Sequence, residues 1–134
     1  MENTLKKYLQ KEEGNKVRFL ITGVTGQLGY DIHRELIQRG YDEKDILALG
    51  REDMDITDKE QVDKIVTAFN PDVIFHCAAW TAVDKAEDMK EACTKVNVEG
   101  SKNITEASIK VGSKLIYTST DYVFDGTTEG IYTE

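Results

Sequence analysis

The chain has 134 residues, which suits about one domain and is too short for a cofactor domain joined to a complete substrate domain. Asp and Glu outnumber Lys and Arg by 25 to 17, and the net charge of -8 argues against a surface that neutralises nucleic-acid phosphates. No apolar run approaches the roughly 20 residues of a membrane-spanning helix, and the N-terminus lacks the apolar stretch of a signal peptide. We therefore expect a cytoplasmic protein with neither a nucleic-acid nor a membrane partner.

Residues 1–16 are rich in Lys and Glu, and we expect them to form an extension outside the folded domain, which we place at 17–134. A first strand is predicted over 17–22, where an apolar, β-branched run leads directly into a glycine. A helix is predicted to follow, because apolar residues then recur every four positions. The residues that share this helical face are Leu28, Ile32 and Leu36.

The alternation of strand and helix continues along the chain. Apolar runs predict further strands over 45–49, 54–56, 73–77 and 114–118. Between the third and fourth strands one helical face gathers Val62, Ile65, Val66 and Phe69. A long helix is predicted over 89–111, with an inner side made of Ala92, Val96, Ile104 and Val111.

Two local signals mark the ends of the helix that contains Val62. Thr57 and Glu60 have the spacing of a capping box, and Asn70-Pro71 ends the helix. Strands that alternate with helices at this spacing predict βαβ units with right-handed crossovers. We therefore predict an α/β fold with a Rossmann-type, doubly wound parallel sheet of about five strands.

Gly23, Gly26 and Gly29 recur at intervals of three where the first strand ends and a helix begins. Such a loop turns tightly, approaches a pyrophosphate closely and offers it the N–H groups and positive dipole end of the helix. The spacing is one residue longer than the GxGxxG motif and resembles the extended branch of the short-chain dehydrogenase/reductase superfamily. The alternative is a tight turn with close helix packing and no ligand.

Arg51 follows the second strand, where a cation accommodates a 2'-phosphate and a carboxylate instead binds a ribose 2'-hydroxyl. We expect NADP(H) to be favoured, with NAD(H) possible because Glu52 and Asp53 follow at once. A solvated Arg51 without a cofactor role is the alternative. Asp55 and Ile56 are candidate contacts to an adenine amino group and ring, whereas a helix cap is the other interpretation of Asp55.

Two longer stretches then resemble one family. They are 77–87, Cys-Ala-Ala-Trp-Thr-Ala-Val-Asp-Lys-Ala-Glu, and 119–126, Ser-Thr-Asp-Tyr-Val-Phe-Asp-Gly. With the glycine-rich loop, 55–58 and Val96-Asn97, they make 17–134 similar to the N-terminal half of the dTDP-4-dehydrorhamnose reductases. The resemblance implies an NAD(P)H-dependent oxidoreductase that reduces the C4 carbonyl of a dTDP-sugar, dTDP-4-dehydro-L-rhamnose, in the last step of dTDP-L-rhamnose synthesis.

The resemblance also assigns roles to residues. It implies pyrophosphate contacts from the glycine-rich loop and a cofactor groove lined by small residues after the 73–77 strand, with Trp80 as a packing anchor in the alternative interpretation. The candidate cofactor-binding residues are Gly23, Gly26, Gln27, Leu28, Gly29, Arg51, Asp55, Ile56, Ala78, Ala79, Trp80 and Thr118.

By the same resemblance Thr120 is the catalytic hydroxyl, which would hydrogen-bond the substrate carbonyl and orient it for hydride attack. Asp121 is a candidate ligand of a sugar hydroxyl, or alternatively the cap of the next turn. Tyr122 is excluded as the proton donor, because Gly126 stands where the family's Tyr-x-x-x-Lys motif needs lysine. That pair and the substrate domain would fall beyond Glu134, so we expect the chain alone to be inactive.

Asn97 and Gly100 lie inside the predicted long helix although neither residue type favours a helix. A close approach to the sheet or to a polar loop would explain them, and a tolerated cost is the alternative. The charged cluster of Asp84, Lys85 and Glu87 is interpreted as a solvated helix start, with a role in the site or an interface as the alternative.

His33 and His76 have no metal-like or triad-like company in the sequence, so we assign them no chemistry. Cys77 and Cys93 fit neither a metal spacing nor a disulfide framework, and we expect both to be reduced. No metal site is predicted. A homodimer is possible, because the last strand would be an unpaired sheet edge.

Two other functions stay open. Some relatives of the family are non-catalytic, NADP-binding regulatory subunits of methionine adenosyltransferase, which an intact Tyr-x-x-x-Lys motif and a dTDP pocket would distinguish from the enzyme. An isolated nucleotide-binding domain without any reaction is the second alternative, and it predicts cofactor binding without turnover in any longer chain.

Overall fold

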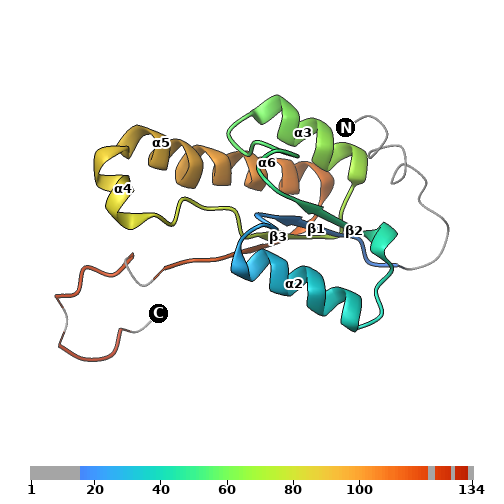
Figure 1. Cartoon of the computed structure of the whole chain (residues 1–134), viewed down its shortest axis with the longest axis horizontal. Helices are drawn as coiled ribbons and strands as arrows, with labels where there is room; N and C mark the ends of the chain where they lie inside the picture. Colours follow the sequence, from blue (N-terminus) through green and yellow to red (C-terminus); the bar gives the residue numbers. More distant parts are fainter. Residues whose placement is uncertain (1–15, 121–122, 128, 133–134) are drawn as a thin grey trace.

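The computed structural model describes residues 16–120, 123–127 and 129–132. They form a four-stranded parallel sheet in the order β2-β1-β3-β4, with α2 on one face and α3 and α6 on the other (Figure 1). The strands are β1 Phe19–Thr22, β2 Ile46–Leu49, β3 Val73–His76 and β4 Lys114–Tyr117. The α/β, Rossmann-type fold predicted from the sequence is therefore confirmed, with four strands among the described residues.

The helices follow the predicted alternation. They are α2 Gln27–Gln38, α3 Lys59–Phe69, α4 Val83–Asp88, α5 Lys90–Thr94 and α6 Ser101–Val111, with a 3-10 turn at Glu43–Asp45 and a π-helical turn at Lys95–Gly100. The predicted helix over 89–111 is thus one continuous run from α5 to α6 whose middle is widened by the π-helical turn. Residues 1–15 of the predicted extension lie outside the described residues, whereas the predicted domain start at 17 lies within them.

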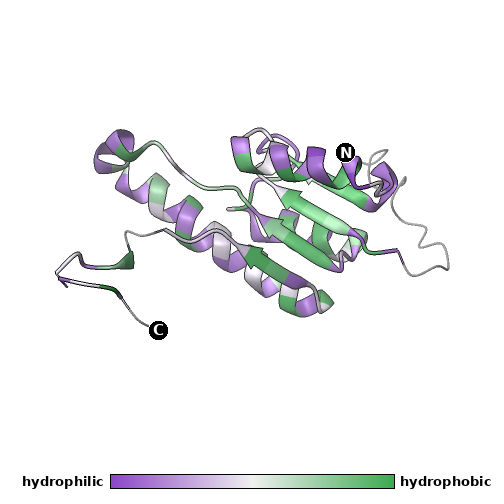
Figure 2. Ribbon diagram, turned by 90° about the horizontal axis from the view of Figure 1, so that it is seen from below, coloured by the Kyte–Doolittle hydropathy of each residue, from purple (hydrophilic) through white to green (hydrophobic). Residues whose placement is uncertain are grey.

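The larger core lies between the sheet and the pair α3 and α6. Its centre is made of fully buried side chains that the 3.6-residue and two-residue periods place on facing surfaces. They include Leu20, Val62, Val66, Phe69, Ile74 and Ile104. Figure 2 shows the apolar strands flanked by helices whose outer surfaces are polar. The predicted apolar face of α3 is therefore confirmed.

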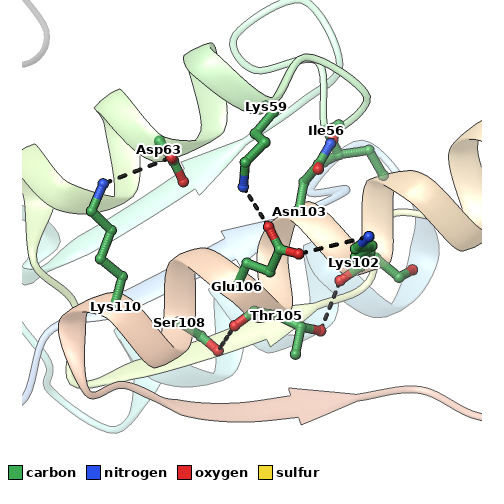
Figure 3. Close-up of polar contacts among 10 residues, drawn as sticks. Ile56, Lys59, Asp63, Lys102, Asn103, Thr105, Glu106, Ser108 and Lys110 are labelled. Atoms are coloured by element: carbon green, nitrogen blue, oxygen red, sulfur yellow. Dashed lines mark hydrogen bonds and ion pairs between the residues drawn. The ribbon is translucent and has the colours of Figure 1, made fainter.

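Surface charges join α3 to α6 above this core. Glu106 accepts from Lys59 and lies 3.9 Å from Lys102, and Lys110 lies 3.7 Å from Asp63 (Figure 3). All of these pairs lie at the surface, with only Asp63 partly buried, and ion pairs there contribute little to stability. Burial of the apolar face, rather than these charges, therefore holds the two helices together.

A smaller core lies on the opposite face. Leu36 of α2 packs there with Phe19, Ile21 and Ile46. Toward β4 this face is less covered, since the Ile116 side chain is 42% exposed. Among the described residues β4 is an edge of the sheet, as the sequence predicts for its last strand.

Two local predictions are wrong. Residues 54–56 form no strand, because Met54 and Ile56 are buried in the larger core as part of a loop. The capping residue of α3 is Asp58, whose Oδ1 accepts from the Gln61 N–H at 3.1 Å, and Thr57 instead donates to Asp55. The apolar residues at 54 and 56 are thus buried from a loop and not from a strand. The cap of α3 lies one residue after the predicted Thr57.

Candidate functional site

Residues 23–29, which we call the glycine loop, connect β1 to α2 at the carboxyl edge of the sheet. Gly23 has a φ angle of 70°, and a Cβ atom on it would lie 2.7 Å from the Ala78 nitrogen. A Cβ atom on Gly29 would lie 2.4 Å from the Gly23 carbonyl oxygen. Neither position accepts a side chain without displacement of backbone, so the glycine spacing matches the close approaches that the loop makes.

The first turn of α2 is open toward solvent. Gly26 is its N-cap and provides no side-chain hydrogen bond, and Gln27 and Leu28 are exposed with it. The Tyr30 N–H donates to the Gly26 carbonyl oxygen at 3.0 Å and so begins the helical ladder. The N–H groups ahead of that bond, with the positive dipole end, suit an anion such as a pyrophosphate. The predicted pyrophosphate contacts therefore lie together at this turn.

Residues 77–82, which we call the floor loop, leave β3 next to the glycine loop. Ala79 is exposed, and Ala78 and Trp80 are half-buried. The Trp80 indole N–H donates to the Ala82 carbonyl oxygen at 3.1 Å, within the same loop. Trp80 is therefore not a fully buried packing anchor, and the groove residues predicted from the sequence share one loop.

Asn97 holds the far end of the floor loop. Its Oδ1 accepts from the Trp80 N–H at 2.7 Å, and its Nδ2 donates to the Trp80 carbonyl oxygen at 3.2 Å. Both bonds join the π-helical turn to the backbone of Trp80. The contact of the Asn97 side chain with a polar loop therefore explains why an asparagine occupies this helical position. The structure thus selects one of the two interpretations of Asn97.

Gly100 allows the same helical run to approach residue 56. A Cβ atom on Gly100 would lie 2.6 Å from Ile56 Cδ1, and Asn103 Nδ2 donates to the Ile56 carbonyl oxygen at 2.9 Å. The Ile56 side chain is 6% exposed. It packs in the core against Gly100, a location that does not favour the expected contact with an adenine ring.

In the loop after β2, two acidic side chains accept hydrogen bonds from nearby residues, whereas the basic side chain faces solvent. The Gly50 N–H donates to Asp53 Oδ2 at 2.9 Å, so this carboxylate closes a turn, while Arg51 is exposed. Asp55 Oδ1 accepts from the N–H and the hydroxyl of Thr57 at 2.9 and 2.8 Å. These bonds, with help from the Arg51 charge, lower the pKa of Asp55 below its usual value. A Cβ atom on Gly50 would lie 3.2 Å from Thr25 Cγ2 of the glycine loop, so the loop with Arg51 and Asp55 forms a rim of the site. Asp55 is not the cap of α3.

A buried hydrogen-bonded chain that sequence reasoning missed lies beneath the floor loop. The Ala78 N–H donates to Thr22 Oγ1 at 3.1 Å, Thr22 Oγ1 lies 2.7 Å from His76 Nδ1, and His76 Nε2 lies 3.1 Å from Ser101 Oγ. His76 is 1% exposed, and this burial lowers its pKa to about 4. The signal for this chain was available, because Thr22 and His76 are the last residues of neighbouring strands.

The predicted catalytic segment is less enclosed. Thr118 and Thr120 follow β4 and are exposed, and the Val123 N–H donates to the Thr120 carbonyl oxygen at 3.4 Å. Asp121 and Tyr122 lie outside the described residues. Thr120 therefore lies just beyond the carboxyl end of β4, the strand that pairs with β3.

Several negative observations apply to 16–120 and the two short described stretches after it. Within them no cluster of three or more His, Cys, Asp or Glu side chains is arranged to hold a metal ion. Cys77 and Cys93 are both free, and burial raises the pKa of Cys77. No helix in this part of the chain combines the length and apolar character needed to cross a membrane. The charged residues Asp84, Lys85 and Glu87 lie exposed on α4.

Comparisons with known proteins follow the same boundaries. The model of the family described as "RmlD substrate binding domain" matches residues 17–134. A dTDP-4-dehydrorhamnose reductase of Aggregatibacter actinomycetemcomitans is 44% identical over 117 residues, which cover 87% of this chain and 39% of that protein. Methionine adenosyltransferase 2 subunit beta of Pongo abelii is 38% identical over 119 residues, which cover 82% and 34%.

Solved structures give the same picture. The crystal structure of a dTDP-4-dehydrorhamnose reductase from Bacillus anthracis in complex with NADP superposes with a TM-score of 0.78 at 42% identity. The superposition covers 84% of this chain and 39% of that one. The chain therefore spans about two fifths of the length of the relatives that it matches.

Proposed function

The chain belongs to the RmlD substrate binding domain family, and we propose that it binds NADP(H) as the N-terminal cofactor half of a dTDP-4-dehydrorhamnose reductase. The observation that carries the proposal is the contact between the glycine loop and the floor loop at Gly23 and Ala78, beside the open first turn of α2. This contact joins a turn suited to a pyrophosphate with small residues at the switch of strand order, where α/β sheets bind ligands.

The residues of the glycine loop fit a dinucleotide. The first N–H groups of α2, at Gln27 and Leu28, would bind the pyrophosphate, with Gly26 beside them, whose own N–H donates to the Gly23 carbonyl oxygen at 3.0 Å. The absence of a side chain at Gly23 would let the floor loop approach the glycine loop. Ala78 and Ala79 would leave space for the cofactor to cross the sheet edge. A bound nicotinamide supplies the hydride for carbonyl reduction.

We assign the preference for NADP(H) to Arg51. It is exposed beside a turn in which the Asp53 carboxylate already accepts from the Gly50 N–H. A carboxylate held in this way is diverted from a ribose 2'-hydroxyl, and the guanidinium can pair with a 2'-phosphate. NAD(H) is expected to bind more weakly, with Asp55 available to the adenosine in both cases.

Thr120 is proposed as the hydroxyl that binds the C4 carbonyl of dTDP-4-dehydro-L-rhamnose, with Asp121 as a ligand of the sugar. The support is the resemblance of residues 119–126 to the family together with the position of Thr120 after β4, at the same sheet edge as the floor loop. The proton donor and its lysine neighbour would come from residues that this chain does not contain. Cytoplasmic location belongs to the same proposal.

The test is a titration of the chain with NADPH and NADH, followed by an assay with dTDP-4-dehydro-L-rhamnose. We expect saturable binding with NADPH tighter than NADH, and no turnover, because general acid catalysis contributes about 10²–10⁴ in rate. Absence of NADPH binding would overturn the cofactor proposal. Turnover by the chain alone would overturn the division of the active site.

The match to methionine adenosyltransferase subunits supports a second candidate function, a regulatory subunit that binds NADP without reducing a sugar. Co-sedimentation with a methionine adenosyltransferase catalytic subunit tests it. A stable complex that forms only with NADP(H) present would favour the regulatory function, and the absence of any complex would favour the reductase.

A further inference from the structure

His76 lies under the floor loop at the centre of the buried chain from Ser101 to Ala78. We propose that His76 is a positioning residue, which orients the Thr22 hydroxyl so that this hydroxyl holds the Ala78 N–H and fixes the floor of the cofactor groove. The expected effect on cofactor affinity rests on the proposed function, whereas the effect on the Ala78 amide does not.

The proposal assigns the protons so that the Thr22 hydroxyl both accepts and donates a hydrogen bond. Thr22 Oγ1 accepts from the Ala78 N–H, so its own proton is available for His76 Nδ1 at 2.7 Å. Nδ1 then carries no proton, and the Nε2–H donates to Ser101 Oγ at 3.1 Å. Among the described residues every buried side-chain nitrogen and oxygen has a partner, so the arrangement leaves no polar atom unsatisfied.

The imidazole has the surroundings of a neutral group. It is 1% exposed and stacks on the Tyr117 ring, with ring centroids 5.6 Å apart. The register places it beside Thr22 on one neighbouring strand and Tyr117 on the other. A side chain held from both strands and from α6 has a fixed orientation, which a positioning residue requires.

Movement of Ala78 would reach the rest of the site. The Ala78 nitrogen is the atom nearest to the missing Cβ of Gly23, so the floor loop and the glycine loop touch at this point. The other end of the floor loop is held by Asn97 at Trp80. The exposed Ala79 thus lies between two fixed points, and His76 acts through Thr22 on the one that touches the glycine loop.

Three substitutions distinguish a positioning role of His76 from simple filling of space. In His76→Asn the amide oxygen takes the place of Nδ1 and still accepts from Thr22. In His76→Gln the longer amide reaches the place of Nε2 and Ser101, and the acceptor for Thr22 is lost. Thr22→Val removes the hydroxyl itself with little change in volume and leaves the Ala78 N–H without its acceptor.

The experiment measures NADPH affinity and hydrogen exchange of the Ala78 amide in the chain and in these three variants. We expect His76→Asn to stay within about twofold of the wild-type Kd, and His76→Gln and Thr22→Val to raise it about tenfold. Exchange of the Ala78 amide should accelerate only in the last two. The Trp80 amide, which Asn97 holds, should exchange at the same rate in all four proteins and serves as the control.

Equal effects of His76→Asn and His76→Gln on Ala78 exchange would overturn the inference, as would unchanged exchange in Thr22→Val. If His76→Gln does not fold, the comparison of Thr22→Val with His76→Asn decides. If the wild-type chain does not bind NADPH, the proposed function fails by itself, and Ala78 exchange still decides whether His76 positions the floor loop.

Discussion

Two regions of the molecule differ in how their geometry is held. The first region is the glycine loop with the floor loop, and the second region is the segment after β4. The floor loop is tied to the sheet at Ala78 and to the π-helical turn at Trp80 by hydrogen bonds that span 56 and 17 residues. Every described residue from 118 to 132 is exposed, and the segment extends away from the sheet (Figure 1). In that segment Asp125 accepts from Thr127 and from Tyr132, which lie close by in the sequence.

This difference indicates which segments of the chain have a geometry that is fixed by contacts with distant residues. Residues 16–82, the π-helical turn and α6 contain the contacts that shape the proposed cofactor groove, whereas the hydrogen bonds named above in the segment after β4 are local. Hydrogen bonds between distant segments hold the proposed groove in one geometry, whereas bonds between sequence neighbours hold only the local turn. The proposed cofactor binding therefore rests on the first of these regions, and the proposed role of Thr120 rests on the second.

Of the effects predicted within the two regions, the largest is at Gly23 in the first region. Gly23→Ala places a methyl group 2.7 Å from the Ala78 nitrogen and should lower the free energy of unfolding by about 2–4 kcal/mol. NADPH affinity should fall at the same time. Denaturant unfolding and NADPH titration measure the two effects.

Gly112→Ala is the matched control for this substitution. Gly112 has the same φ angle of 70°, but nothing lies within 4 Å of its missing Cβ. It should cost only the left-handed strain of about 1–2 kcal/mol and leave NADPH affinity unchanged. Equal costs at the two glycines would contradict the close approach of the glycine loop and the floor loop.

The second prediction concerns pH and the chain beneath the floor loop. Burial lowers the pKa of His76 from 6.5 to about 4, so the unfolded protein takes up this proton at a higher pH than the folded protein. The contribution of His76 is present above pH 6.5 and is lost as pH falls toward 4, by about 3 kcal/mol. Unfolding in urea from pH 7 to pH 4 should therefore show a flatter profile for His76→Asn than for the wild-type chain. Parallel profiles would contradict a buried neutral imidazole.

The third prediction concerns Arg51 and Asp53, at the rim of the first region. Arg51→Gln should raise the Kd for NADPH about tenfold and leave the Kd for NADH nearly unchanged, because only NADPH carries the 2'-phosphate. Asp53→Asn preserves an acceptor for the Gly50 N–H and removes a negative charge, so it should tighten NADPH about twofold. Equal losses for both cofactors in Arg51→Gln would assign Arg51 another role.

The smallest effect is predicted in the second region. Phe124 is 51% exposed and its ring lies 4.5 Å from that of Tyr132. Phe124→Ala should change the free energy of unfolding by less than about 0.5 kcal/mol, as exposed substitutions usually do. Phe69→Ala, at a fully buried ring, should cost about 3–5 kcal/mol. A large cost at Phe124 would show that the segment after β4 packs on the domain.

Sequence patterns predicted the features that depend on neighbours along the chain. The apolar face of α3 and the glycine loop follow from short periods in the sequence. The chain beneath the floor loop is absent from such patterns, because His76 finds its partners 54 and 25 residues away, and only the pairing of the ends of two neighbouring strands indicates it. The wrong strand at 54–56 has the same cause, since burial of Ile56 against Gly100 is a contact between distant segments.

Isothermal titration of the chain with NADPH tests the central claim most directly, namely that the cofactor site is complete within these residues. We predict saturable binding of one NADPH per chain, weaker binding of NADH, and loss of the preference in Arg51→Gln. No heat of binding with either dinucleotide, from a chain that is shown to be folded, would contradict the claim.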